Sequence, residues 1–452
     1  MSILNKKAFF VFGAARSGRA AAILLAGKKY SVSLYDDDSS AVEVFMKSQE
    51  IAGLESRLTS VERAQAEAVL LQSDCLVLSP GVALDHPLVV AARKNGVHII
   101  SELELAYQFC SEKLIAVTGT NGKSTVVNII GQILQEAGER TVVAGNVGKP
   151  FSSVISTGHL YDRIVLEVSS FQLDTIVEFK ADIAVLLNVT PDHLDRYGDS
   201  FDEYALSKAR ILNGADENST FVYNAEDEVC RRIAQNFQGR KIEFSSARRL
   251  DEGVYLQADS IVSRFGGRED ILMNRNEFTP IGVHNAENAM AAVAAVAPLD
   301  INKEVIVDAL KKYHPLPHRM ELVRVIGGVA YVNDSKATNV DAAVKSIVSI
   351  KGNLILIIGG RDKNGDFSVL LPNLDHVSNV IVIGEAARKI EKILREKCSV
   401  TNASDMDQAV LLASKTARAG DTVLLAPACA SFDMFKDYAH RGEAFKSSVK
   451  AL

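Results

Sequence analysis

The chain has 452 residues, 47% of them hydrophobic, and its 50 Lys and Arg against 56 Asp and Glu give a formal net charge of -6. This composition is typical of a globular protein with two to four domains, and it excludes the strong overall positive charge that suits nucleic acid or anionic membranes. The five cysteines are scattered without a C-x-x-C pair, which argues against disulfides and a zinc site and favours a reducing, cytoplasmic setting. Because no uncharged apolar run approaches the roughly 20 residues of a membrane helix, we expect no membrane insertion.

Strands that alternate with helices predict three segments. The first has a strand at residues 8–12, a glycine turn, an Ala/Leu-rich helix and a second strand that ends at Asp36. Continuous aliphatic runs in the second, such as 114–117 and 183–187, suit strands buried on both faces. The expected strands of the third lie at 329–332, 354–358, 380–383 and 422–425.

This order predicts an α/β fold of three doubly wound domains. We expect a Rossmann-like N-terminal domain at 1–102, a P-loop-type central domain at 103–315 and a Rossmann-like C-terminal domain at 316–452. The second boundary falls in His314-Pro315-Leu316-Pro317, because these prolines cannot continue the alanine-rich helix expected within 280–298.

A glycine-rich loop, Thr118-Gly119-Thr120-Asn121-Gly122-Lys123-Ser124-Thr125, joins the expected strand at 114–117 to a helix from about Val126. The backbone N–H groups of such a loop bind anions, Lys123 adds a positive charge, and the Ser124 hydroxyl suits Mg²⁺. The spacing departs from G-x-x-x-x-G-K-[ST], because Val117 occupies the first glycine position. The alternative is a helix start with Thr120 or Asn121 as N-cap and a solvated Lys123. The strand before the loop and the helix after it favour phosphate binding.

Two candidate metal ligands follow neighbouring expected strands. Glu167 ends the aliphatic run 164–166, at the edge where open α/β sheets bind ligands, and a carboxylate there suits Mg²⁺. His193 reaches the same edge from the loop after Asn188, although a lone loop histidine is more often a surface residue. Lys208 lies in a helical stretch, where spacing alone favours a solvated side chain.

The first segment carries a glycine pattern, Gly13-x-Ala15-x-x-Gly18, with Asp36 near the position of the acidic residue in dinucleotide-binding domains. The middle glycine of that fingerprint is replaced by Ala15, whose methyl group hinders the close approach of a pyrophosphate. The pattern therefore disfavours NAD binding.

Taken together, these motifs resemble the Mur ligase family over nearly the whole chain. Residues 119–125 are similar to its nucleotide loop, 167–173 to its second motif and 188–197 to its histidine motif. His284-Asn285-x-x-Asn288, His318-Arg319 and Asn333-Asp334-Ser335-Lys336-Ala337-Thr338-Asn339 follow in family order. The last stretch, with 427–433, is similar to the members that add D-glutamate.

The resemblance implies ATP- and Mg²⁺-dependent joining of D-glutamate to UDP-N-acetylmuramoyl-L-alanine, by a cytoplasmic monomer that makes a peptidoglycan precursor. Lys123, His193 and Lys208 would be catalytic. Ser124 and Glu167 would bind one Mg²⁺, and His193 with a carbamylated Lys208 would bind a second. An ammonium group beside two Mg²⁺ ions would be repelled, whereas a carbamate is anionic.

The resemblance also assigns residues to three substrates. Those implied for ATP are Gly119, Thr120, Asn121, Gly122, Lys123, Ser124, Thr125, Asn285, Asn288, Arg319 and Asp334. Those implied for the UDP substrate are Arg16, Ser17, Asp36, Asp37, Ser79, Gly81 and Asn146, although Arg16 and the neighbouring Asp38 depart from a relative's residues. Those implied for D-glutamate are Thr338, Lys363, Ser431 and Phe432.

Simpler interpretations stay open for four of these residues. Asn285 could be a helix N-cap, Asp334 a turn former, Lys363 an exposed loop lysine and Ser431 a helix cap. At the level of function, the alternatives are a sister ligase that adds another amino acid, a P-loop kinase or NTPase, and an NAD-dependent oxidoreductase.

Overall fold

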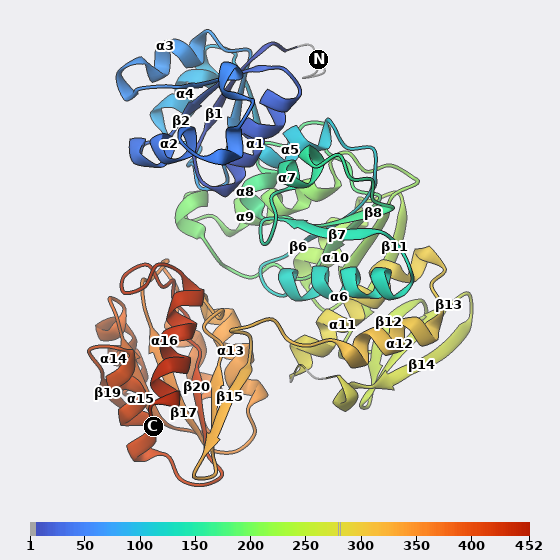
Figure 1. Cartoon of the computed structure of the whole chain (residues 1–452). Coiled ribbons are helices and arrows are strands. Elements are labelled where there is room, and N and C mark those ends of the chain that lie inside the picture. The colour runs from blue at the N-terminus through green and yellow to red at the C-terminus, as the bar shows by residue number, and fades with distance from the viewer. Residues whose placement is uncertain (1–5, 279, 281) are drawn as a thin grey trace.

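The computed structural model describes residues 6–278, 280 and 282–452, and these form three α/β units in chain order (Figure 1). Each unit is built on its own sheet, and the sheets have five, nine and six strands. The predicted fold of three α/β units is confirmed.

The first sheet is parallel throughout, in the order β3-β2-β1-β4-β5. Along β1 the side chains alternate between two cores, Phe9 and Val11 on one face and Phe10 and Phe12 on the other. A strand covered on both faces has no solvent-facing position, which is why this segment is apolar throughout. The elements are β1 (Ala8–Phe12), α1 (Arg16–Gly27), β2 (Ser31–Tyr35), α2 (Ser39–Met46), β3 (Leu58–Ser60), α3 (Ala66–Leu71), β4 (Cys75–Leu78), α4 (Pro87–Lys94), β5 (His98–Ser101) and α5 (Glu102–Tyr107).

The second sheet has the order β14-β13-β12-β11-β10-β9-β6-β8-β7. Its parallel part contains the strands expected at 114–117, 164–166 and 183–187, whereas the antiparallel strands β12, β13 and β14 at one edge were not predicted. The strands are β6 (Lys113–Thr118), β7 (Thr141–Gly145), β8 (Arg163–Glu167), β9 (Ile183–Leu186), β10 (Thr220–Asn224), β11 (Arg240–Ser245), β12 (Gly253–Gln257), β13 (Ser260–Phe265) and β14 (Arg268–Asn274).

Helices cover both faces of the second sheet. The helix expected from about Val126 begins earlier, at Lys123, and the alanine-rich helix expected within 280–298 is α11. The helices are α6 (Lys123–Glu136), α7 (Phe151–Ser156), α8 (Ser170–Leu173), α9 (Phe201–Ala209), α10 (Glu228–Gln235), α11 (Val283–Val296) and α12 (Lys303–Lys312).

The third sheet has the order β15-β16-β20-β17-β18-β19 and is parallel except for β15, which pairs with β16 as a hairpin. All four strands expected in this segment are present, and the two edge strands, β15 of the hairpin and β19, are additions. The elements are β15 (Glu321–Ile326), β16 (Val329–Asn333), α13 (Val340–Ser349), β17 (Leu354–Gly359), β18 (Val377–Ile383), α14 (Ala387–Leu394), β19 (Ser399–Asn402), α15 (Met406–Thr416), β20 (Thr422–Leu425) and α16 (Tyr438–Lys450).

The first two units share a core where α1, α5 and α7 pack together (Figure 1). Glu104 of α5 is fully buried there, and its carboxylate accepts the backbone N–H groups of Val177 at 2.8 Å, Glu178 at 3.0 Å and Phe179 at 2.9 Å. Three charge-assisted hydrogen bonds offset the cost of burying this group. Glu104 therefore fastens the connecting helix to the second unit.

In the described part of the chain, every helix is too short or too polar to cross a lipid bilayer.

Candidate active site

The glycine-rich loop turns sharply between β6 and α6. Gly119 and Gly122 have φ values of 152° and 90°, which are readily adopted only by glycine. A β-carbon on Gly122 would also overlap Oδ1 of Asn288. The backbone N–H groups of Thr120 and Asn121 donate to the carbonyl and side-chain oxygens of Asn188 at 2.9 and 2.8 Å. The next strand end thus holds the loop in shape.

The N-cap of α6 is Gly122, and no side chain caps this helix. The alternative in which Thr120 or Asn121 is the cap is therefore wrong. Backbone N–H groups in the first turn of a helix lack intrahelical partners and attract anions. The loop and the first turn of α6 therefore have the geometry that attracts an anion.

Lys123 folds back over the loop, because its Nζ donates to the carbonyl oxygens of Gly119 and Thr120, both at 2.8 Å. It is therefore not the solvated side chain of the alternative interpretation. Burial lowers the pKa of Lys123, and this effect is opposed by the nearby carboxylates of Glu167 and Asp192. A phosphate would give this amine the counter-charge that it lacks.

Glu167 ends β8 and is almost fully buried. Its Oε1 accepts a hydrogen bond from Nδ2 of Asn146 at 3.1 Å, and its Oε2 is buried without a hydrogen-bond partner among the described residues. Leaving a carboxylate oxygen unpaired is costly, and a hard divalent cation such as Mg²⁺ would satisfy it. The site therefore fits the predicted metal ion.

His193 follows β9 in a left-handed conformation with φ 53°. Its ring lies edge-on to Phe171, with centroids 5.1 Å apart. Burial lowers the pKa of His193 to about 4, although Asp192 acts in the opposite direction. The imidazole is consequently neutral at physiological pH, which is the form that binds a metal ion.

Lys208 lies on the inner face of α9 and is only 2% exposed. Its Nζ donates to the carbonyl oxygen of Gly119 at 2.9 Å and lies over the ring of Tyr204, 4.6 Å from the centroid. Burial, and secondly the charge of Lys123, place the pKa of Lys208 well below its ordinary value. The interpretation of Lys208 as a solvated helix residue is wrong.

These side chains share one cavity of about 180 Å³, which we call the metal-site cavity. Among the described residues, no group of three or more His, Cys, Asp and Glu side chains is arranged to hold a metal ion. Other oxygen groups of the cavity, such as the Ser124 hydroxyl, would have to contribute to such a site. The cavity is lined by Thr120, Asn121, Gly122, Lys123, Ser124, Asn146, Glu167, Ser169, Ser170, Phe171, Asp192, His193, Tyr204, Lys208, Arg319, Lys336, Thr338 and Asn339.

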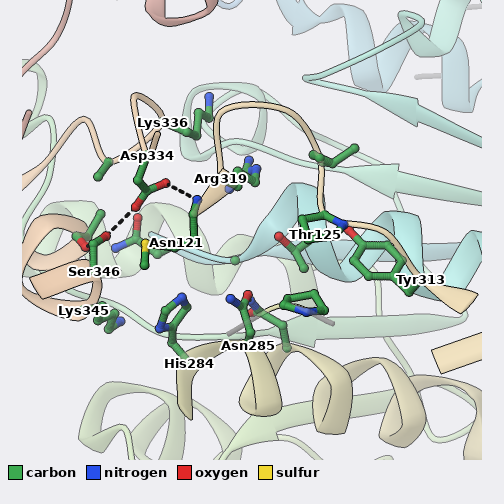
Figure 2. Close-up of a pocket in the computed structure, with 18 residues that line it drawn as sticks. Asn121, Thr125, His284, Asn285, Tyr313, Arg319, Asp334, Lys336, Lys345 and Ser346 are labelled. Atoms are coloured by element: carbon green, nitrogen blue, oxygen red, sulfur yellow. Dashed lines mark hydrogen bonds between the residues drawn. The ribbon is translucent and has the colours of Figure 1, made fainter. Parts of the chain in front are cut away.

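A second cavity, which we call the nucleoside cavity, lies between α11 and the third unit (Figure 2). It brings together the predicted nucleotide contacts Asn285, Asn288, Arg319 and Asp334. Asn285 lies in the first turn of α11, and Asn288 donates to its Oδ1 at 3.2 Å. Because the N-cap of this helix is Gly282, the N-cap interpretation of Asn285 is wrong.

Asp334 is buried at the wall of the nucleoside cavity. Its carboxylate accepts hydrogen bonds from the Ser346 hydroxyl and, at 3.2 Å, from the backbone N–H of Met320 (Figure 2). Burial raises the pKa of Asp334, although the Ser346 hydrogen bond and the charge of Arg319 lower it. These contacts give Asp334 a tertiary role beyond that of a turn former.

The third unit closes onto the second through Asp192, which the sequence analysis did not single out. The Asp192 carboxylate accepts hydrogen bonds from Nζ of Lys363 at 2.6 Å and from Nδ2 of Asn339 at 3.0 Å. Burial acts to raise the pKa of Asp192, but the charges of Lys363 and His193 bring it to about 2. Lys363 is thus a partly buried ion-pair partner, and its interpretation as an exposed loop lysine is wrong.

The four predicted D-glutamate residues are not all together. Thr338 lines the metal-site cavity, and Lys363 lies at its edge through Asp192. Ser431 is buried but lines neither cavity, and it caps no described helix. Phe432 is 63% exposed. The structure therefore gathers only Thr338 and Lys363 near the other site residues.

The predicted UDP contacts of the first unit surround the carboxyl edge of its sheet. Asp36 accepts the backbone N–H of Ala14 at 2.6 Å, and Asp37 accepts the Tyr35 hydroxyl at 2.8 Å. Ser79 lies beside Gly13, and Arg16 and Ser17 begin α1. Asn146 is separate from this group, because it is bonded to Glu167 in the metal-site cavity.

Sequence analysis missed Lys336, which lines both cavities. Its Nζ lies over the Tyr438 ring, 3.9 Å from the centroid. Burial, and secondly the charge of Arg319, lower the pKa of Lys336 to about 7. Its place between Asp334 and Thr338 was the available signal, because both neighbours had been selected.

The second and third α/β units meet at the glycine-rich loop and at two cavities that share lining residues, an arrangement typical of nucleotide-using enzymes, and family models identify the class. Residues 7–101 match the Mur ligase MurD-like N-terminal domain, 117–296 the Mur ligase middle domain and 318–429 the Mur ligase glutamate ligase domain. The chain belongs to the Mur ligase family.

Curated relatives narrow the comparison. The chain is 40% identical over 448 residues to UDP-N-acetylmuramoylalanine–D-glutamate ligase of Koribacter versatilis, covering 99% of this chain and 98% of that protein. It is 38% identical over 454 residues to the ligase of the same name from Geotalea uraniireducens, covering 100% and 99%.

Solved structures agree on the fold. A pseudomurein peptide ligase type C from Methanothermus fervidus superposes with a TM-score of 0.64 at 18% identity, covering 98% of this chain and 99% of that one. UDP-N-acetylmuramate–alanine ligase of Thermotoga maritima gives a TM-score of 0.60 at 17% identity, covering 99% and 100%.

Proposed function

We propose that this enzyme joins D-glutamate to UDP-N-acetylmuramoyl-L-alanine at the expense of ATP, in the synthesis of a peptidoglycan precursor. The observation that carries the proposal is the full-length similarity to ligases of that name, at 38–40% identity. A loop built for phosphate, next to a cavity with an unsatisfied carboxylate, supports it. A sister ligase for another amino acid is the principal alternative.

A carboxylate is a poor acyl donor, so ATP first phosphorylates the alanyl carboxylate to an acyl phosphate. The amine of D-glutamate then attacks that carbon, a tetrahedral intermediate forms, and inorganic phosphate leaves. Lys123 and the N–H groups of the loop 119–122 would hold the transferred phosphate and offset its charge. Bound Mg²⁺ supplies further positive charge at the phosphoryl oxygens.

Ser124 and Glu167 would hold one Mg²⁺, and His193 with a modified Lys208 would hold a second. Burial, and secondly the charge of Lys123, lower the pKa of Lys208 and so favour its neutral amine, which is the form that attacks CO₂. The product is a carbamate: a new N–C bond forms, the amine loses one proton, and the group becomes anionic. This modification would add an anionic oxygen ligand beside His193 in the metal-site cavity.

The two cavities suggest how ATP is held. Its triphosphate would lie on residues 119–125, and its nucleoside would lie among Asn285, Asn288, Arg319 and Asp334. D-Glutamate would contact Thr338 and Lys363, with Ser431 and Phe432 as predicted further contacts.

The UDP part of the acceptor would lie on the first unit. Its predicted contacts are Arg16, Ser17, Asp36, Asp37, Ser79 and Gly81, and Asn146 would contact the same substrate from the metal-site cavity. We accordingly propose domains at 1–102, 103–315 and 316–452, in a cytoplasmic monomer.

The deciding experiment measures phosphate release with Mg-ATP, UDP-N-acetylmuramoyl-L-alanine and a panel of amino acids. Among the amino acids of the panel, we expect only D-glutamate to support turnover. Turnover with L-lysine or meso-diaminopimelate but not D-glutamate would assign the chain to a sister activity, and ATP hydrolysis without any amino acid would favour a plain NTPase. Lys123→Ala should abolish turnover, whereas Lys113→Ala should not, because Lys113 forms only an exposed ion pair with Asp182.

A further inference from the structure

The nucleoside cavity contains one buried polar atom that the proposed reaction leaves unused. Tyr313 is 3% exposed and lines this cavity, yet its hydroxyl has no hydrogen-bond partner among the residues that the structure describes. An unpaired hydroxyl in a protein interior costs free energy. Such an atom at the wall of a ligand cavity indicates a contact that forms only when the ligand is bound.

The Tyr313 ring is held rigidly, which fixes the position of the hydroxyl. It follows the last residue of α12 and stacks on Phe278, with centroids 5.8 Å apart and planes inclined by 21°. Burial raises the pKa of Tyr313 to about 12, although Arg319 acts in the opposite direction. The hydroxyl therefore keeps its proton at neutral pH and can both donate and accept a hydrogen bond.

The two ends of the nucleoside cavity differ in chemistry. Figure 2 shows Tyr313 beside Thr125 and Asn285 at one end, whereas Asp334 and Ser346 lie at the other. The Tyr313 end carries the Thr125 hydroxyl and the Asn285 amide and contains no carboxylate of the cavity wall, and the apolar residues Pro280, Pro315 and Leu316 are also part of the cavity lining. A flat, neutral heteroaromatic base suits this end, and the sugar hydroxyls suit the end with the carboxylate.

We infer that the Tyr313 hydroxyl hydrogen-bonds the purine base of the nucleotide and contributes to the choice of base. This inference rests on the proposed function, because it takes the cavity as the site of the ATP nucleoside. It adds a base contact from the segment that leads into the third unit, so the same residue connects nucleotide recognition with the join between units.

The test compares the wild type with Tyr313→Phe, which removes the hydroxyl and keeps the ring on Phe278. Tyr331→Phe is the matched control, because Tyr331 is a buried tyrosine of β16 that lines neither cavity. ADP binding is measured by titration calorimetry. We expect Tyr313→Phe to raise the Kd about 2- to 10-fold and the control to leave it unchanged.

Nucleotide analogues identify the bonded group. Diphosphates of purine riboside and of 1-, 3- and 7-deaza-adenosine each lack one polar atom of the base, and 2′- and 3′-deoxy-ADP each lack a sugar hydroxyl. At least one base analogue should bind the wild type more weakly than ADP does, yet bind the wild type and Tyr313→Phe equally. If a sugar analogue, rather than a base analogue, removed the difference, the inference would be overturned.

Thermal unfolding without nucleotide separates recognition from folding. Tyr313→Phe removes an unpaired buried hydroxyl, so its melting temperature should match or exceed that of the wild type. A lower melting temperature with an unchanged ADP Kd would show that the hydroxyl serves the fold alone. Wild-type protein that binds no ADP would instead contradict the proposed function, so the two failures are distinguishable.

Discussion

The Nζ of Lys208 donates to the carbonyl oxygen of Gly119 across 89 positions of sequence, at 2.9 Å. This contact places a buried amine with a lowered pKa directly beside the glycine-rich loop. The proposed carbamate would form on this amine.

We expect Lys208→Ala to lower phosphate release at least about 100-fold, because the loss of one charge-stabilising group in a closed site has an effect of this order. Small carboxylates such as formate or acetate should restore part of the activity. Depletion of dissolved CO₂ should slow the wild type and leave the variant unaffected. The control is Lys180→Ala, which removes only a surface ion pair with Asp216. A wild type indifferent to CO₂ would count against the carbamate.

Substitution of Gly122 should disable nucleotide binding. An alanine at this position adopts φ 90° with strain, and its β-carbon would overlap Oδ1 of Asn288. We expect Gly122→Ala to raise the Kd of ADP by more than about 10-fold, equivalent to about 1.4 kcal/mol. Gly138→Ala is the matched control, since Gly138 has φ 85° with open space around it. Equal effects of the two substitutions on ADP affinity would refute a specific role for the Asn288 contact.

Asp192→Asn should weaken the contact between the second and third units. It removes the charged partner of Lys363, and the loss of one member of a partly buried ion pair costs about 1–3 kcal/mol, between the exposed and the fully buried case. Small-angle scattering of the unliganded protein should show a larger radius of gyration than in the wild type. Asp162→Asn, which disrupts an exposed pair with Arg140, should leave the radius unchanged.

The contact between Asp192 and Lys363 should also have a defined pH window. The pKa of Asp192 is about 2, below the value of about 3.9 for an unperturbed aspartate. A group whose pKa is depressed in the folded state contributes fully above its unfolded pKa, and its contribution is lost as the pH falls through the folded value. The wild-type radius should therefore be constant from about pH 5 to pH 8. Expansion within that range would contradict the assignment.

Glu104→Gln tests stability apart from catalysis. The buried carboxylate accepts three backbone N–H groups, and an amide replaces one acceptor oxygen with a donor. We expect a loss of about 2–3 kcal/mol in unfolding free energy, measured by urea denaturation, with kcat of the folded enzyme unchanged. Glu178→Gln is the control, because Glu178 is exposed and accepts a hydrogen bond from the Gln108 side chain, which also donates to Glu104. An equal loss in both variants would argue against the backbone contacts as the cause.

The site residues that were easiest to predict are those whose positions depend on a short, contiguous stretch of sequence. The loop 119–125 combines two glycines, a lysine and a hydroxyl between a strand and a helix, and these features are contiguous. Glu167 was predictable for a similar reason, because the end of a parallel strand fixes which edge of the sheet a side chain reaches. The edge strands β12 to β14 and β15 were not foreseen, because no continuous aliphatic run marks an exposed antiparallel hairpin.

Residues defined by tertiary burial were harder to predict. Residue spacing predicted a solvated Lys208, because the apolar residues of its helix show no clear periodicity that would tell a buried position from an exposed one. Asp192 was overlooked because its partner, Lys363, lies 171 positions later. Lys336 was missed because its place in the site depends on how the third unit packs against the second, which the sequence does not give.

Four residues, Asn121, Gly122, Arg319 and Lys336, belong to the walls of both cavities. A ligand that moves or orders these residues changes the binding free energy of a ligand in the other cavity. Thermodynamic reciprocity then requires that the factor by which a nucleotide alters the affinity for the amino acid equals the factor by which the amino acid alters that for the nucleotide. The four shared residues would therefore couple the binding of the nucleotide to the binding of the second ligand.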